Sequence, residues 1–204
     1  PPQSASVLRT AYFDKFFAWG KDYSSFGKLE ASFGGKKIKL DIMLSFAAPD
    51  YLKITFLSPF YTPAGYASVS GEGASFSDLP DIPGIGKYKD SIKSWMGVML
   101  MDLRDFYMGR YNKANLKNWK SMSYVSEYGA KVKLQKSGMP GKIISARNKK
   151  IELEINNYLV ADKYMFPLEI QFKAPYAKGK IILKPENMKY DSKNDLRSFV
   201  KMKP

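Results

Sequence analysis

Alternation of apolar and polar residues with a period of two is the feature that most constrains the fold of this chain. Between residues 38 and 46 every second position is apolar: Ile38, Leu40, Ile42, Leu44 and Phe46. The same alternation recurs at residues 151–155 and 168–172. Successive side chains of a strand point to opposite faces, so these segments indicate strands with one buried face. A mainly β, antiparallel architecture is therefore predicted.

The candidate strands fall into two runs separated by a helix. Gly34-Gly35 predicts a hairpin turn, and further turns are predicted at Asn156-Asn157 and at residues 177–179. The expected strands are 26–33, 38–46, 51–57, 65–70 and 74–77 in the first run, and 121–128, 130–136, 142–147, 150–155, 168–174 and 179–183 in the second.

Two amphipathic helices are predicted, over residues 4–19 and 90–108. In the second helix apolar residues recur at i, i+3, i+4 and i+7 from Ile92, with Asp90 as its N-cap and Gly109 as its stop. Two helices are few for so much sheet, so a strongly curved sheet with helices on its concave side is expected. No segment has the composition of a domain linker, which predicts a single domain over residues 1–204.

Methionines gather on the second predicted helix. Met96, Met99 and Met101 lie within it, and Met43 lies on the long strand. Methionine fills irregular gaps in ordinary cores and is also frequent at surfaces that accept varied apolar ligands. An ordinary core helix and a helix lining a soft cavity both fit the pattern.

The connection of residues 58–64 is unusually apolar for a surface loop. It holds Phe60 and Tyr61 between Pro59 and Pro63, and proline prevents the segment from continuing the strand ladder. The two aromatic side chains therefore either fold back onto the core or point outward toward an apolar partner.

Composition narrows the classes of function. The chain has 33 basic and 19 acidic residues, a net charge of +14, which indicates an anionic partner such as lipid headgroups or nucleic acid. It contains no cysteine and no histidine, so disulfides, thiolate chemistry and histidine-based catalysis are excluded, and no metal or cofactor is expected. No apolar run approaches the roughly 20 residues that span a bilayer.

The motifs that could carry catalysis have simpler explanations. Gly84-Ile85-Gly86-Lys87 lacks the remaining residues of a phosphate-binding loop. Glu152 and Glu154 share one face of a strand and are expected on its solvated side, and Asp102 and Asp105 are expected on the polar side of the second helix. The sequence therefore predicts a protein that is not an enzyme.

Three stretches resemble the LolA/LolB family of bacterial periplasmic lipoprotein carriers, with the greater likeness to LolB. They are residues 51–60, residues 103–109, and Gly179–Leu183 followed by Met188-Lys189-Tyr190. The chain departs from the family pattern where Phe60-Tyr61 replaces Leu-Gly and Phe106 replaces a tryptophan. The resemblance implies an unclosed β-barrel with a helical lid, a cavity for acyl chains, and a protruding apolar residue at the position of Phe60.

The resulting hypothesis is non-enzymatic binding and transfer of lipid or lipoprotein acyl chains at the periplasmic face of the outer membrane, by a monomer. The start at Pro1-Pro2-Gln3 leads us to expect a processed product, and a lipoprotein anchor is compatible with this localisation. Phe60 and Tyr61 are the predicted membrane-contacting loop. The predicted cavity lining is Leu40, Ile42, Leu44, Phe46, Ile54, Phe56, Trp95, Met96, Met99, Leu100, Leu103 and Phe106.

Two alternatives stay open at this point. One is a protein-interaction or sensor module on the same fold. The other is a basic nucleic-acid-binding β domain, which the net charge favours but the dispersal of the lysines disfavours.

Overall fold

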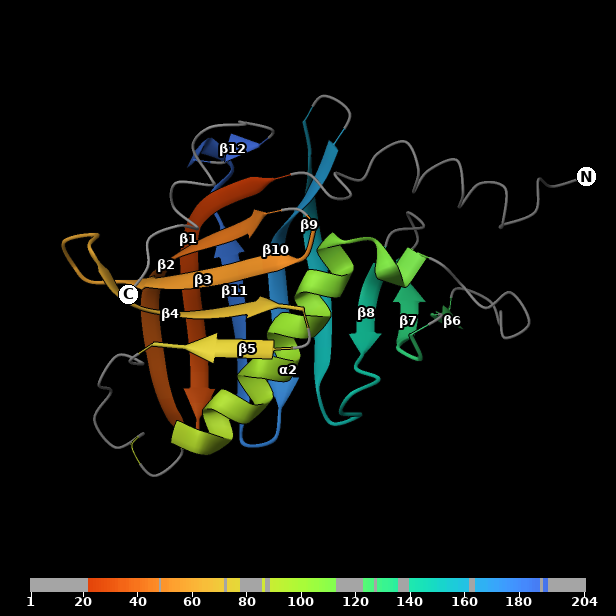
Figure 1. The fold of residues 1–204 in the computed structure, drawn as a ribbon, viewed down its shortest axis with the longest axis horizontal. Helices are drawn as coiled ribbons and strands as arrows, with labels where there is room; N and C mark the ends of the chain where they lie inside the picture. Colours follow the sequence, from red (N-terminus) through yellow and green to blue (C-terminus); the bar gives the residue numbers. More distant parts are fainter. Residues whose placement is uncertain are drawn as a thin grey trace, which may run out of the picture.

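The structure is a computed structural model, and it shows one long antiparallel sheet that curves around the helix Lys89–Tyr107 (Figure 1). It describes residues 22–47, 49–71, 73–77, 86, 89–112, 123–126, 128–135, 140–161, 164–187 and 189–190. The predicted helix at residues 4–19 lies outside this part of the chain.

The strands follow the chain in two runs on either side of helix α2. The first run is β1 (Tyr23–Phe33), β2 (Lys36–Ala47), β3 (Tyr51–Leu57), β4 (Pro63–Ser70) and β5 (Gly73–Phe76). Helix α2 (Lys89–Tyr107) and the short 3-10 helix η2 (Arg110–Asn112) come next. The second run is β6 (Ser123–Val125), β7 (Lys131–Leu134), β8 (Pro140–Ile144), β9 (Glu152–Ala161), β10 (Tyr164–Ala174) and β11 (Ala177–Leu183), followed by η4 (Pro185–Asn187) and β12 (Lys189–Tyr190).

The two runs join through β1 and β11 into one sheet. The strand order is β5-β4-β3-β2-β1-β11-β10-β9-β8-β7-β6, and β12 pairs with the beginning of β1. The terminal strands β5 and β6 are not paired with each other, so the sheet stays open. The predicted class, a strongly curved antiparallel sheet in the form of an unclosed β-barrel, is confirmed.

Helix α2 covers the concave face of the sheet. The Trp95 ring stacks on Phe33 of β1 at 5.7 Å between centroids and on Phe172 of β10 at 5.6 Å. At the other end of the helix the Tyr107 ring packs against Tyr23 of β1 and Phe46 of β2. The apolar side chains of α2 and of the inner sheet face thereby form one buried core.

The polar residues of the alternating strands form ion pairs on the outer face of the sheet. Glu30 on β1 faces Lys39 on β2 and Lys180 on β11, and it forms ion pairs with them at 2.9 and 3.4 Å. Glu152 on β9 is paired with Lys142 on β8 at 2.6 Å. The polar half of each strand is therefore the solvated outer face, as expected for Glu152 and Glu154.

Most strand boundaries agree with the sequence pattern, but two predicted turns are wrong. Strand β9 continues through Asn157, whose backbone takes a φ of 50° within the strand. The turn between β10 and β11 is Pro175-Tyr176, so Ala177–Gly179 belongs to β11. Asparagine tolerates a positive φ, and the glycine at position 179 serves close packing instead of a turn.

The space around Gly179 is too small for any side chain. A Cβ atom at this position would lie 2.4 Å from the carbonyl oxygen of Glu30 and 2.6 Å from the Phe172 ring. Strands β1 and β11 therefore pair closely beneath the aromatic stack that holds α2. None of the described helices is both long and apolar enough to cross a membrane.

Gly179→Ala should lower the free energy of unfolding by about 1–3 kcal/mol, because the added methyl group overpacks against backbone that cannot move away. Urea denaturation measures the change. Gly73→Ala is the matched control, since the nearest atom to its added Cβ is 3.7 Å away and little change is expected. Equal stability of the two variants would contradict this account of Gly179.

Candidate functional site

The predicted cavity-lining residues lie on helix α2 and on strands β2 and β3. Eleven of them are at most 6 % exposed, and Leu40 is partly buried against the same cluster. The structure thus places them in one buried apolar cluster. Whether they contact a ligand stays a prediction.

The middle of this cluster is fully closed. Ile42, Leu44, Leu100, Leu103 and Phe106 are 0 % exposed, so their side chains are enclosed by neighbouring protein atoms. Trp95, Met96 and Met99 nearer the beginning of α2 retain 3–6 % exposure. In this arrangement an acyl chain could reach the centre of the cluster only by displacing α2 from the sheet.

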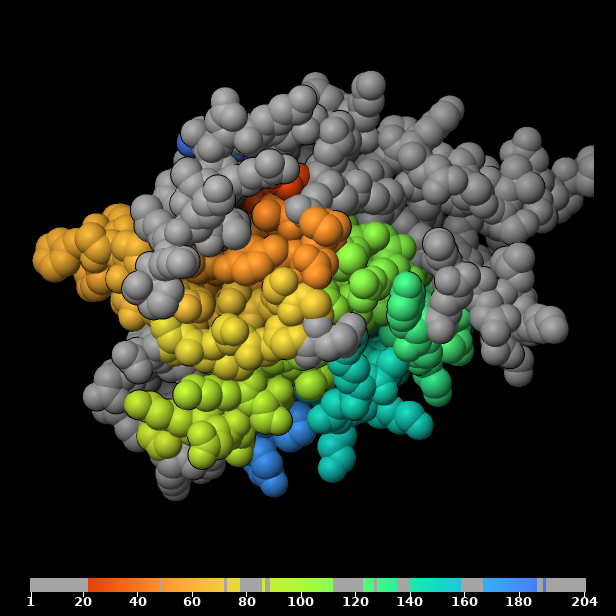
Figure 2. Space-filling view, viewed as in Figure 1, coloured from red at the N-terminus to blue at the C-terminus, as the bar shows by residue number. Residues whose placement is uncertain are grey.

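The connection between β3 and β4 answers the question that the sequence left open. Phe60 is 87 % exposed and Tyr61 is 62 % exposed, so neither side chain folds onto the core. The segment projects from the body of the molecule, at the left in Figures 1 and 2. The aromatic pair is therefore presented to the surroundings.

Hydrogen bonds hold this projecting segment in one shape. The Ser58 N–H donates to the Thr62 carbonyl at 2.8 Å, and the Tyr61 N–H donates to the Ser58 carbonyl at 2.9 Å. The Ser58 hydroxyl accepts from the Phe60 N–H at 3.2 Å and pairs with the Thr62 hydroxyl at 2.7 Å. The backbone groups of a proline-interrupted turn are thus satisfied without the two aromatic rings.

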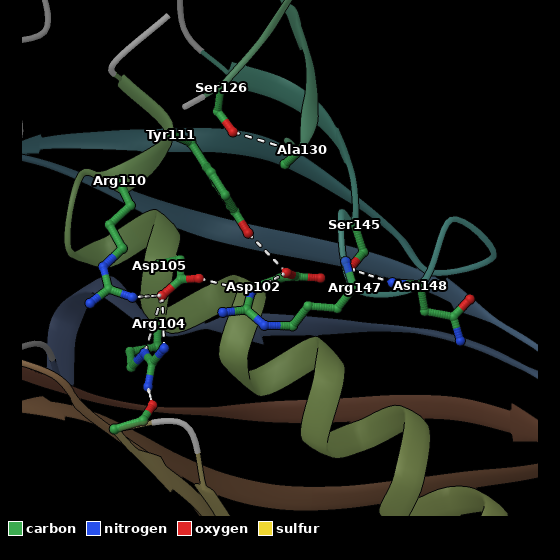
Figure 3. Close-up of polar contacts among 11 residues, drawn as sticks. Asp102, Arg104, Asp105, Arg110, Tyr111, Ser126, Ala130, Ser145, Arg147 and Asn148 are labelled. Carbon is green, nitrogen blue, oxygen red and sulfur yellow. Dashed lines mark hydrogen bonds and ion pairs between the residues drawn. The ribbon is translucent and has the colours of Figure 1, made fainter. Parts of the chain in front are cut away.

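A network of buried charges fixes the last turns of α2 (Figure 3). Asp102, Arg104 and Asp105 are at most 1 % exposed. The sequence predicts Asp102 and Asp105 on the solvated polar side of the helix, and that prediction is wrong because both side chains are buried. Partners of the three residues lie outside the periodic pattern of α2, in η2 and in two turns that are distant in the sequence, so the periodicity of the helix carried no signal for their burial.

The η2 helix and the turn between β8 and β9 supply two of the cations around the aspartates. Arg147, in the turn between β8 and β9, lies 3.0 Å from Asp102 Oδ1 and 2.8 Å from Asp105 Oδ2. Arg110 of η2 lies 3.0 Å from Asp105 Oδ1, and the Tyr111 hydroxyl donates to Asp102 Oδ1 at 2.8 Å. The network ties α2 to the second run of strands.

Arg104 extends the same network toward the first run. Its Nη2 lies 2.9 Å from Asp105 Oδ1, and its Nη1 donates to the carbonyl of Gly71 in the turn between β4 and β5. Helix α2 is therefore anchored by charged hydrogen bonds to the turns of both halves of the open sheet.

Burial raises the pKa of the Asp102 carboxyl above its ordinary value, although hydrogen bonds from Ser145 and Tyr111 and the charge of Arg147 act in the opposite direction. Because the pKa of the Asp102 carboxyl is raised in the folded state, its contribution to the free energy of unfolding falls as the pH rises and the carboxyl ionises. The ionised network thus depends on Arg147 at neutral pH.

The outer face carries a separate groove of about 630 Å³ over β1, β2 and β9–β11. Its walls are charged and include Glu152 and Glu154, both within 3.5 Å of Lys142. A hydrogen bond from Lys142 lowers the pKa of Glu152, which is opposite to what a general acid requires. No metal-binding cluster of acidic side chains occurs among the described residues.

Arg147→Met should lower the free energy of unfolding at pH 7 by about 3 kcal/mol, because it leaves buried carboxylates without their shared cation. The loss should shrink as the pH falls toward about 5, since the pKa of Asp102 rises further and the carboxyl protonates. Urea denaturation at both pH values measures it.

Lys142→Met is the control for Arg147→Met, because it removes an outer ion pair and should cost only about 0–1 kcal/mol. A loss in Arg147→Met that is no larger than in this control, or that grows toward acidic pH, would contradict the role given to the network.

Comparison with known proteins gives relatives at the level of structure only. No family model matches the sequence, and no curated protein matches it significantly. Among solved structures, a domain assigned to outer membrane lipoprotein sorting from Vibrio parahaemolyticus is similar, with a TM-score of 0.57 and 16 % identity over 96 % of this chain and 94 % of that one.

Two further solved structures share the architecture. A LolA superfamily protein from Nitrosomonas europaea has a TM-score of 0.54 and 11 % identity, and covers 98 % of both chains. A DUF1329 family protein from Desulfovibrio piger has a TM-score of 0.51 and 10 % identity over 94 % of this chain and 92 % of that one. At these identities the likeness concerns the fold, and the chain has a LolA/LolB-like fold.

Proposed function

We propose that this protein is a non-enzymatic carrier of lipid or lipoprotein acyl chains, working as a single monomeric LolA/LolB-like domain at the periplasmic face of the outer membrane. The observation that carries the proposal is the exposed, hydrogen-bonded presentation of Phe60 at 87 % exposure. The similar lipoprotein-sorting domain of Vibrio parahaemolyticus supports the same class of cargo.

The Phe60 segment has the properties of a membrane anchor. Because its backbone is already ordered, inserting the ring into the headgroup layer costs little further conformational entropy. Tyrosine is favoured at the boundary between water and lipid, where its ring is apolar and its hydroxyl is hydrated, which suits Tyr61 beside Phe60. The net charge of +14 adds attraction to anionic lipid.

The proposed acyl site is the apolar surface between α2 and the concave face of the sheet. Each methylene group moved from water into this surface contributes about 0.8 kcal/mol, so partial burial of an acyl chain gives tight binding without any catalytic group. Met96 and Met99 on α2 can adopt new shapes around an entering chain. The closed centre of the cluster requires α2 to move aside during loading.

Phe60→Glu combined with Tyr61→Glu should reduce flotation with anionic liposomes several-fold, because two carboxylates replace the apolar anchor. Tyr128→Glu is the matched control, since Tyr128 is 50 % exposed and lies in the turn between β6 and β7. Flotation of the double variant at the wild-type level would remove the loop from the proposal.

A disulfide between Ala74→Cys and Gly97→Cys tests the movement of α2. A Cβ at position 97 would lie 3.2 Å from the Cβ of Ala74, close to the spacing that a disulfide needs, and the chain has no other cysteine. The oxidised variant should bind a fluorescent fatty acid at least tenfold more weakly than the same variant after reduction.

The two single-cysteine variants control for the substitutions themselves, and native mass spectrometry of freshly purified protein reports any co-purified lipid. Equal fatty-acid binding by the oxidised and reduced forms would show that acyl chains do not enter between α2 and β5.

A further inference from the structure

The described chain contains three residues other than glycine with a positive φ: Tyr61, Asn157 and Tyr176. Asparagine adopts this conformation readily, but a tyrosine does so at a cost in free energy. Both tyrosines lie in turns between strands, and Tyr176 is 82 % exposed. A strained backbone that persists at an exposed aromatic residue points to a use for its side chain.

The turn that carries Tyr176 would accept a glycine more easily. Pro175-Tyr176 connects the paired residues Ala174 and Ala177, and Tyr176 has a φ of 65°. The second position of such a turn favours glycine. The Tyr176 carbonyl accepts a hydrogen bond from the Gly34 N–H at 3.2 Å, which holds the turn beside the β1–β2 turn. The backbone is fixed while the ring extends into solvent.

The segments that form this turn and the adjacent β1–β2 turn contain several lysines and no acidic residue. Residues 31–40 include Lys36, Lys37 and Lys39, residues 171–184 include Lys173, Lys178, Lys180 and Lys184, and neither segment contains Asp or Glu. The strand register places Ser32 opposite both Lys37 and Lys178, and Lys178 opposite Lys173. The row next to the turn therefore carries lysines on β2, β11 and β10, with the neutral Ser32 of β1 between the lysines of β2 and β11.

Acidic side chains adjoin this row of lysines, and each of them also pairs with a lysine outside it. Glu30 is already paired with Lys39 and Lys180, so it does not neutralise the row that holds Lys37 and Lys178. Glu152 is directly opposite Lys173 at the end of that row, where it interacts with Lys173 and is also paired with Lys142 at 2.6 Å, so four lysines near the turn face one shared carboxylate. The surface around Tyr176 thus combines one exposed aromatic ring with excess positive charge.

We propose that the β10–β11 turn is a second membrane-contacting point, with Tyr176 in the headgroup layer and Lys36, Lys37, Lys173 and Lys178 against anionic phospholipid. Tyrosine prefers this layer, and lysine side chains reach the headgroups while their stems stay on apolar surface. The proposal rests on the proposed function only in taking a bilayer as the partner.

The topology allows both points to face a membrane. Strands β1, β3 and β10 run in the same direction, so the β1–β2, β3–β4 and β10–β11 connections lie at the same end of the strands. The bend of β1 and β2 separates the β3–β4 connection from the other two (Figure 1). One contact would let the molecule swivel on the bilayer. A second contact at a distance from Phe60 restricts its orientation.

The test uses single cysteines labelled with an environment-sensitive fluorophore, because the wild-type chain has no cysteine. Tyr176→Cys, Phe60→Cys and Tyr128→Cys are each titrated with phosphatidylglycerol–phosphatidylcholine vesicles at low salt. The label at position 176 should shift to the blue, as in an apolar environment, while that at position 128 should not.

The labels also separate the two proposals. A blue shift at position 60 alone overturns the second contact and leaves the proposed function intact. A shift at position 176 alone supports the second contact and overturns the anchor role of Phe60. No shift at either position overturns both, and an equal shift at position 128 overturns the second contact as a specific site.

A second variant separates binding from folding. Tyr176→Gly relieves the positive φ, so its thermal midpoint should equal or exceed that of the wild type while its vesicle partition coefficient falls several-fold. Lys37→Gln combined with Lys178→Gln should lower the partition coefficient about fivefold per lysine at low salt, and less at high salt.

Binding of an acidic peptide or a single-stranded oligonucleotide provides the counter-test. If Tyr176→Gly weakens binding to one of these polyanions but leaves vesicle binding unchanged, the surface serves another partner and the membrane proposal is overturned.

Discussion

The packing of α2 into the concave face of the sheet is the interaction on which the rest of the structure depends. A curved, open sheet exposes an apolar inner face that some other element must cover. Trp95 lies against β1 and β10, the two strands on either side of β11. One helix thereby joins strands from both runs of the chain, and the hairpins project outward from this common core.

Two kinds of interaction hold α2, and they differ in what they permit. Apolar contacts around Trp95, Met96 and Met99 are non-directional, so another apolar group such as an acyl chain can replace them. The bonds of Arg104 and Asp105 are directional, and no acyl chain can substitute for them. The helix therefore combines an exchangeable apolar face with a fixed polar anchor near its end.

The periodic elements were predictable because they depend on local chemistry. The stretch from Ile38 to Phe46 pairs as a strand, and Gly34 and Gly35 form the hairpin turn with φ values of 53° and 85°. Helix α2 ends at Tyr107, and Gly109 follows it in the turn with a φ of 73°. The wrong prediction for the two aspartates has a tertiary cause. Asp102 and Asp105 lie at positions that suit a solvated helix face. The folded chain brings Arg147 and Arg110 next to them as ion-pair partners, and this allows both carboxylates to be buried.

The sequence by itself determined that the chain forms an antiparallel sheet with one apolar face and an amphipathic helix to cover it, since a strand period of two and a helix period of 3.6 are properties of the local backbone. Only the tertiary structure decided that Phe60 points into solvent, that two aspartates are buried, and that Tyr176 occupies a turn at a positive φ. Exposure depends on which distant segments cover a residue, and residues far apart in the chain supply that cover.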